Sequence, residues 1–158
     1  MKHPESLELV AEFHRTFKHP ILEKPAIPDE GRCRLRVALI AEELRELEEG
    51  IQQKDIVGVA DALSDIQYVL SGAILEFGLG RKFKALFEEV QRSNMSKACE
   101  SEEDAIGTIE YYKKKDGTEC YYKREGSKWL VYRKSDNKTM KSIRYSPADL
   151  TSIVNADD

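Results

Sequence analysis

The sequence predicts a mainly α protein, a four-helix bundle followed by a small C-terminal antiparallel β meander. Two observations predict this fold class. Four successive segments carry apolar side chains three or four positions apart, the spacing that places them on one face of a helix. After Lys97 the pattern changes to short runs of β-forming residues separated by turn signals such as Lys115-Asp116-Gly117. We therefore expect a helical domain at residues 1–98 and a β-meander appendage with a tail at residues 99–158.

The first two predicted helices are defined by their end signals as well as by their apolar faces. A helix over residues 5–18 should end at His19-Pro20, because proline lacks the N–H group that a continuing helix needs. Asp29 is the expected N-cap of a long helix that runs to about Gly50. The apolar stripe of this second helix consists of Val37, Ile40, Leu44, Leu47 and Ile51.

The third predicted helix, about residues 56–77, is apolar around most of its circumference and stops at Gly78-Leu79-Gly80. Such a helix is typical of the middle of a bundle or of a subunit interface. The exception is one face that carries Asp61 and Asp65. A fourth amphipathic helix is expected at about residues 81–92.

The appendage is predicted to begin with an acidic loop at residues 100–104. Short strands are expected at residues 106–112, 120–123, 128–132 and 139–145. From Thr108 to Tyr145, eleven basic residues outnumber five acidic ones, a net charge of +6 in a chain whose total is −4. Such a segment suits anions or nucleic acid, although lysines also keep exposed strand edges from pairing with other chains.

Composition places the chain among folded soluble proteins, with 41% hydrophobic and 34% charged residues in 158. No apolar run reaches the roughly 20 residues that span a membrane, and the first residues do not resemble a signal peptide. Three scattered cysteines form no CxxC pair, so neither a zinc site nor a disulfide framework is implied. The cytoplasm is the expected location.

Two acidic clusters lie on successive predicted helices: Glu42, Glu43 and Glu46 on the second, and Asp61 and Asp65 on the third. These spacings place carboxylates one turn apart on one helix face, where like charges repel. Hard divalent cations such as Mg²⁺ bind oxygen ligands of this kind, often together with substrate phosphates. The clusters therefore predict a metal site if the two helices face each other.

Each cluster also has a plainer interpretation. The glutamates are typical of the solvated flank of an amphipathic helix. Asp61 and Asp65 lie on an otherwise apolar helix, where buried carboxylates need a partner, and an arginine such as Arg36 could supply it. Tyr68, one turn beyond Asp65, could hydrogen-bond the site or belong to the core.

Other side chains are assigned from their position on a helix or strand. His14 is expected on the exposed side of the first helix. Core positions are expected for Phe13, Phe17 and Trp129. The segment Arg92–Lys97 has hydrogen-bond donors at nearly every position, so it is either a helix C-terminus with favourable cations or a loop that contacts phosphate and base.

Three motifs together resemble the all-α nucleoside triphosphate pyrophosphohydrolases. They are Glu-Glu-x-x-Glu at residues 42–46, the aspartate motif at residues 61–65, and Ser-Asn-Met-Ser-Lys at residues 93–97. Their contexts resemble the MazG-like, phosphoribosyl-ATP pyrophosphohydrolase-like branch of that superfamily. The resemblance covers about residues 5–98, and some relatives carry a similar β appendage.

The family pattern is ExxE followed by ExxD, and this chain departs from its second half. Glu43 and Glu46 match ExxE, but the glutamate of ExxD falls at Gly58 or at Ala62. We infer that Asp61 and Asp65 jointly replace that motif.

The resemblance implies a role for each candidate residue. The implied metal ligands for Mg²⁺, with Mn²⁺ as a substitute, are Glu43, Glu46, Asp61 and Asp65, of which Glu46 and Asp65 are also the expected catalytic residues. The expected substrate-binding residues are Tyr68, Asn94, Lys97 and Arg36.

The function that this resemblance implies is Mg²⁺-dependent hydrolysis of (d)NTPs to (d)NMPs and pyrophosphate, as nucleotide-pool cleansing. One alternative is the phosphoribosyl-ATP pyrophosphohydrolase step of histidine biosynthesis. Another is an inactive relative that acts as a nucleic-acid or partner-binding module. A nucleoside triphosphate is the expected partner, and the chain is expected to form a homodimer or homotetramer. No binding to a membrane is expected. Binding to a nucleic acid is expected only if the chain is the inactive relative.

Overall fold

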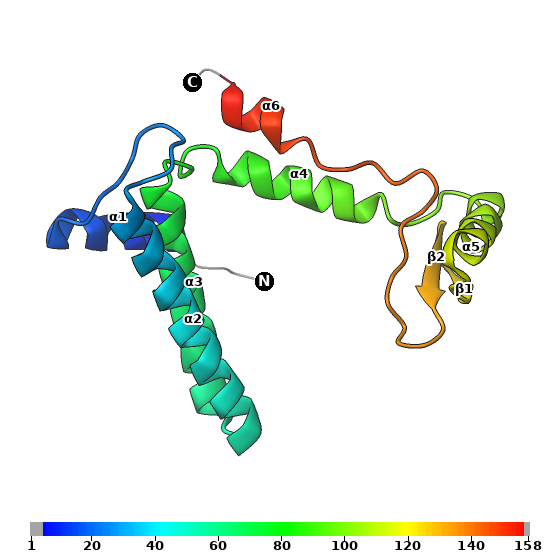
Figure 1. Cartoon of the computed structure of the whole chain (residues 1–158), viewed down its shortest axis with the longest axis horizontal. Helices are drawn as coiled ribbons and strands as arrows, with labels where there is room; N and C mark the ends of the chain where they lie inside the picture. The colour runs from blue at the N-terminus through cyan, green and yellow to red at the C-terminus, as the bar shows by residue number, and fades with distance from the viewer. Residues whose placement is uncertain (1–4, 157–158) are drawn as a thin grey trace. The chain divides into compact units, whose positions relative to one another are not determined.

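The computed structural model describes residues 5–156, which form six helices and one two-stranded antiparallel sheet (Figure 1). The mainly α prediction is confirmed. The chain divides into two compact units, with the boundary between Phe83 and Lys84, and each unit has its own hydrophobic core. The domain limit expected at residue 98 stays a prediction.

The first unit contains three helices: α1 (Ser6–Phe17), α2 (Glu30–Gln53) and α3 (Ile56–Glu76). Asp29 caps α2 as predicted, since its carboxylate accepts a hydrogen bond from the backbone N–H of Arg32 at 3.0 Å. Lys54, in a left-handed conformation with φ of 56°, ends α2, and the Asp55 carboxylate caps α3. Because only these two residues link the helices, α2 and α3 lie antiparallel and side by side (Figure 1).

The α2–α3 hairpin is closely packed near its connection. A Cβ atom at Gly50 would lie 3.0 Å from the backbone N of Val59, so glycine allows the two backbones to approach. Helix α1 packs mainly against α3, where Val10, Ala11 and Leu75 form the core of this unit. No helix within residues 5–156 is long and apolar enough to cross a membrane.

Several predictions about the first helix are wrong. His14 is buried, with only 2% of its surface exposed, whereas Phe13 and Phe17 are 37% and 61% exposed. The reason is that the His14 ring bonds to Arg36 of α2 and to the carbonyl of Pro20 and lies against Gly72 of α3, which places the neighbouring phenylalanines toward the outside of α1.

The four-helix bundle is not confirmed. Helix α4 (Phe83–Met95) is grouped with the second unit from Lys84 onward, so the first unit holds three described helices. The second unit also contains α5 (Glu102–Asp116) and α6 (Leu150–Asn155). In this unit the backbone N–H of Asp149 donates to Glu89 of α4 at 2.8 Å, which holds the start of α6 beside α4.

The predictions of an acidic loop at residues 100–104 and a strand at residues 106–112 are wrong, because α5 occupies this stretch. Ser101 caps the helix by accepting a hydrogen bond from the backbone N–H of Asp104 at 3.1 Å. Three acidic residues lie in the first turn, three lysines lie in the last turn, and Gly117 ends the helix in a left-handed conformation. This charge distribution is the one that the helix dipole favours.

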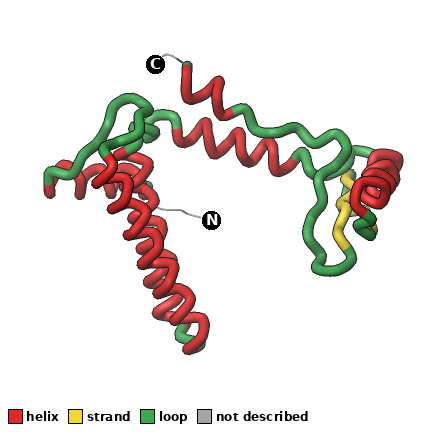
Figure 2. The backbone as a smooth tube through the Cα atoms, viewed as in Figure 1, coloured by secondary structure: helices red, strands yellow, loops and turns green. Residues whose placement is uncertain are grey.

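The β meander is reduced to one hairpin of β1 (Cys120–Glu125) and β2 (Lys128–Arg133) (Figure 2). The strand expected at residues 139–145 is absent from the described structure, where only an isolated bridge joins Thr139 to Tyr132. One face of the hairpin packs against α5. The buried members of this core are Cys99, Ala105, Cys120, Val131 and Met140, and Trp129 packs against them. All three cysteines are free.

Candidate functional site

The α2–α3 hairpin brings the two acidic motifs opposite each other. Glu43 of α2 is half-buried and lies within electrostatic reach of Asp65 and Asp61 on α3, and of Glu46 and Glu42 on its own helix. Partial burial, followed by repulsion from these carboxylates, raises the pKa of Glu43. The five carboxylates therefore share one neighbourhood.

The aspartates of α3 are more exposed than expected. Asp61 and Asp65 both lie at the surface, so the expectation of two buried carboxylates is wrong. Arg36, the candidate partner of this pair, forms its ion pair with Glu76 instead. The face of α3 that carries the two aspartates stays open because α1 and α2 cover only part of the circumference of α3.

The carboxylates fit Mg²⁺ or Mn²⁺ in their chemistry, because both ions prefer oxygen ligands. Burial is the main cause of the raised pKa of Glu43, and the neighbouring carboxylates add a repulsion that a bound cation would relieve. Within residues 5–156, no three acidic, histidine or cysteine side chains converge closely enough to hold a metal. Binding a cation therefore requires the exposed carboxylates to rotate toward one another.

A hollow of about 230 Å³ lies one helical turn from these carboxylates, between α1, α2 and α3. Two of the expected substrate-binding residues, Tyr68 and Arg36, line it. Leu39, which lines the α2 wall, precedes Glu43 by one turn. The rings of Phe13 and Tyr68 meet edge to face with their centroids 5.7 Å apart, so an aromatic wall faces the hollow.

A buried ionic network borders the same hollow. The Glu76 carboxylate has no exposed surface and accepts hydrogen bonds from Arg32, whose Nε is 3.0 Å from Oε2, and from Arg36. The other contact of Arg36 is Nε2 of His14, 3.2 Å from its Nη2. Among the described residues, the buried Nε of Arg36 has no hydrogen-bond partner. Gly72 leaves room for this guanidinium, since a Cβ there would lie 2.6 Å from Nη1.

The network sets the protonation of its own members. Burial alone would raise the pKa of Glu76, but the hydrogen bonds from Arg32 and Arg36 outweigh it and lower that pKa. Burial lowers the pKa of His14, and the charge of Arg36 lowers it further. His14 donates from Nδ1 to the carbonyl of Pro20 at 2.9 Å, which leaves Nε2 as an acceptor toward Arg36. A neutral His14 therefore fits this arrangement.

Asn94 and Lys97, the remaining expected substrate-binding residues, belong to the second unit. The Lys97 ammonium donates to Oδ1 of Asn94 at 2.7 Å. Their neighbours in the segment Arg92–Lys97 contact the chain itself. Arg92 donates to the Ser146 hydroxyl at 3.0 Å, and the Ser93 hydroxyl donates to the hydroxyl of Tyr145 at 3.0 Å. The donors of this segment thus anchor residues 145–147, and Asn94 and Lys97 remain the candidates for ligand contact.

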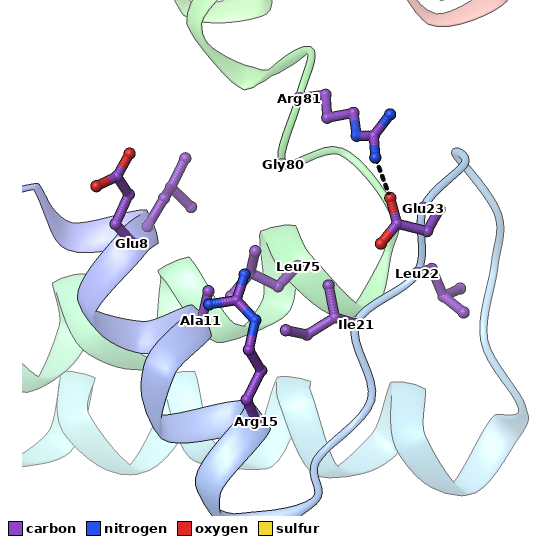
Figure 3. A pocket seen from close by; sticks show the side chains of 10 residues that line it. Glu8, Ala11, Arg15, Ile21, Leu22, Glu23, Leu75, Gly80 and Arg81 are labelled. Atoms are coloured by element: carbon purple, nitrogen blue, oxygen red, sulfur yellow. Dashed lines mark hydrogen bonds and ion pairs between the residues drawn. The ribbon is translucent and has the colours of Figure 1, made fainter.

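A larger hollow of about 440 Å³ lies elsewhere in the first unit, between α1 and the loop that follows it (Figure 3). The expected site residues are not among those that line it. Four charged residues line it, and two of them, Glu23 and Arg81, form an ion pair at 2.5 Å. The larger hollow is therefore not part of the carboxylate site.

The family model described as phosphoribosyl-ATP pyrophosphohydrolase matches residues 10–94, more than half of the chain. The chain belongs to the phosphoribosyl-ATP pyrophosphohydrolase family. This family is part of the MazG-like all-α NTP pyrophosphohydrolase superfamily, so the resemblance seen in the sequence motifs is confirmed. The match includes both acidic motifs and the buried network.

An uncharacterized protein of Acanthamoeba polyphaga mimivirus is similar to this member of the phosphoribosyl-ATP pyrophosphohydrolase family. The two are 33% identical over 94 residues, which is 57% of this chain and 38% of the viral protein. The chain thus spans well under half of the length of that relative. The name of the viral protein assigns no activity, so the family match is the comparison that bears on function.

Sequence reasoning missed Glu76, the buried carboxylate that holds two arginines. The signal that singled out Asp61 and Asp65 was a charged residue in an apolar helix. Glu76 carries the same signal, since it interrupts the run from Ile74 to Phe77. A search for charged residues in the apolar helix would have found Glu76. It would not have shown that Glu76, and neither aspartate, is the buried carboxylate.

Proposed function

We propose that this chain is a Mg²⁺-dependent nucleoside triphosphate pyrophosphohydrolase that converts (d)NTPs to (d)NMPs and pyrophosphate and so cleanses the nucleotide pool. The observation that supports it most is the position of Glu43 opposite Asp61 and Asp65, where their repulsion contributes to its raised pKa. Membership of the family supports a pyrophosphohydrolase reaction on a nucleotide.

The proposed reaction is hydrolysis of the anhydride between the α and β phosphorus atoms. The water oxygen bonds to phosphorus, the phosphorus–oxygen bond to the leaving pyrophosphate breaks, and the water proton passes to a carboxylate. We assign this proton transfer to Glu46, with Asp65 as the second catalytic residue. Mg²⁺, or Mn²⁺ in its place, would offset phosphate charge and acidify the water. Its proposed ligands are Glu43, Glu46, Asp61 and Asp65.

The first unit contains two of the proposed substrate-binding residues. Tyr68 and Arg36 line the 230 Å³ hollow, which has an aromatic wall suited to a base. The charge of Arg36 is shared with Glu76, so Arg36 contributes mainly by shaping this wall. Asn94 and Lys97 are proposed to contact base and phosphate.

Phosphoribosyl-ATP is the second candidate substrate, because the matching family model is described by its hydrolysis. It carries the same triphosphate, so the same carboxylates would serve both reactions. The gap in the second acidic motif, at Gly58 or Ala62, motivates the third candidate, an inactive relative that binds a partner.

We also propose that the chain acts as a cytoplasmic homodimer or homotetramer. Apolar side chains of α2 and α3 remain exposed in the single chain, including Val37 at 69%, Ile56 at 75% and Val57 at 74%. A second copy that covered them would remove this apolar surface from water.

The test is product analysis of a panel of NTPs, dNTPs and phosphoribosyl-ATP with Mg²⁺ or Mn²⁺. We expect pyrophosphate and a monophosphate, and a loss of about 100-fold or more in kcat for Glu46→Gln and Asp65→Asn. Glu48→Gln is the matched control, because Glu48 is exposed on the same helix outside both motifs. The enzyme proposal is rejected if the wild type releases no more pyrophosphate with metal than Glu46→Gln does. If phosphoribosyl-ATP is the only compound that is hydrolysed, it replaces the (d)NTPs as the proposed substrate.

A further inference from the structure

The second unit has a hollow of about 340 Å³ whose charged side chains are both basic. Lys115 of α5 and Lys141 line it, and no carboxylate is among its lining residues. Three aromatic rings belong to the same wall: Tyr111, Tyr112 and Tyr145. Lysines bind the anionic phosphate of a nucleotide, and aromatic rings stack on its flat base. The hollow therefore has a partner for each of these two parts.

The lysines of the hollow lie over its rings. The Lys141 ammonium is 4.3 Å from the centroid of the Tyr145 ring. The Lys115 ammonium is 5.5 Å from the centroid of Tyr111 and 6.0 Å from that of Tyr112. Within the described part of the chain, neither lysine forms an ion pair with a carboxylate. Asp116 lies within electrostatic reach of Lys115, but neither lysine is neutralised by a salt bridge among the described residues, so both attract an anion.

The walls of the hollow are held in place before any ligand binds. The backbone N–H of Ile143 donates to the Thr108 hydroxyl at 3.1 Å, which ties this wall to α5. The backbone N–H of Ser142 donates to the carbonyl of Lys97 at 3.2 Å. The hydroxyl of Tyr145 accepts from Ser93 at 3.0 Å. These contacts fix the backbone of Ser142 and Ile143 and the ring of Tyr145, so this wall needs little ordering on binding.

We propose that this hollow binds single-stranded nucleic acid, with a base stacked on the exposed ring of Tyr111 and phosphates at Lys115 and Lys141. Tyr111 is 49% exposed, so a base can reach its ring beside Lys115. The net charge of +6 over residues 108–145 favours a polyanion over a free nucleotide. This proposal is independent of the carboxylate site and of its reaction.

The test is fluorescence anisotropy of a labelled oligothymidylate of about 20 nucleotides with the full chain, in EDTA so that no metal-dependent hydrolysis occurs. Removing two phosphate contacts with Lys115→Ala/Lys141→Ala should reduce the slope of log K against log salt by about 1.4. The control Lys134→Ala/Lys138→Ala removes the same charge from the same unit outside the hollow. It should leave the salt slope near that of the wild type.

Tyr111→Ala tests the stacking contact separately, and because Tyr111 is exposed, the variant should fold. We expect weaker binding by about fivefold or more with an unchanged salt slope. Four results would each overturn the proposal: no saturable binding at low salt, equal losses in the control, equally tight binding of a duplex, or equally effective competition by a free triphosphate at matched nucleotide concentration.

Discussion

Glu76→Gln tests whether the buried network holds the first unit together. Glu76 has no exposed surface, and the side chain of one of its two arginine partners, Arg36, is only 9% exposed. The substitution leaves a buried guanidinium without its counter-charge, for which losses of about 3–5 kcal/mol are typical. With a urea dependence of about 2 kcal/mol/M, a loss of about 4 kcal/mol would lower the unfolding midpoint by about 2 M.

The matched control is Glu23→Gln. Glu23 pairs with Arg81 in the same unit, but the two side chains are 70% and 67% exposed, so we expect a loss below about 1 kcal/mol. The double variant Glu76→Leu/Arg36→Met removes both buried charges, and it should be more stable than Glu76→Gln. Urea unfolding followed by circular dichroism measures all three. A loss for Glu76→Gln as small as that of the control would refute the reasoning, as would a double variant less stable than Glu76→Gln.

Three other perturbations test the carboxylate site, His14 and Gly72. Glu43→Gln should weaken Mg²⁺ binding in calorimetry and reduce its pH dependence, because the raised pKa of Glu43 lets protons compete with the metal; an unchanged pH dependence would contradict this. The free energy of unfolding should fall as pH falls through about 6.5, because the pKa of His14 is lowered in the folded state and the unfolded state therefore binds the extra proton. His14→Gln should flatten this dependence of unfolding free energy on pH, as measured in urea titrations. A pH dependence that persists in the variant would point to another group. Gly72→Ala should destabilise by about 1–3 kcal/mol despite a gain of about 1 kcal/mol in helix propensity, because the new Cβ would meet Nη1 of Arg36; a higher thermal midpoint would show that Arg36 moves aside freely.

Local signals predicted the helices that have clear caps and apolar stripes. Asp29 illustrates this success, since its carboxylate caps α2 as expected. Helix α5 shows where the reasoning failed. The aromatic and β-branched residues from Ile106 to Tyr112 favour a strand, but the Ser101 cap and the lysines of the last turn stabilise a helix. β propensity is a weak signal that end effects and packing override.

The paired acidic motifs were visible in the sequence, but their environments were not. The spacing of Glu43 and Glu46 and of Asp61 and Asp65 identified one face on each of two helices, and the two-residue link brought those faces together. The expectation of buried aspartates failed because an apolar helix can remain partly uncovered in a single chain.

The sequence by itself determined the family, the acidic motifs and most helix positions, because periodicity, caps and motif spacing depend on neighbours within a few turns. Only the tertiary structure decided that Glu76 is the buried carboxylate and that Arg36 serves it. Those two residues are 40 positions apart. Burial and ion pairing depend on which distant segments pack together, and the local pattern around Asp61, Asp65 and Glu76 is alike.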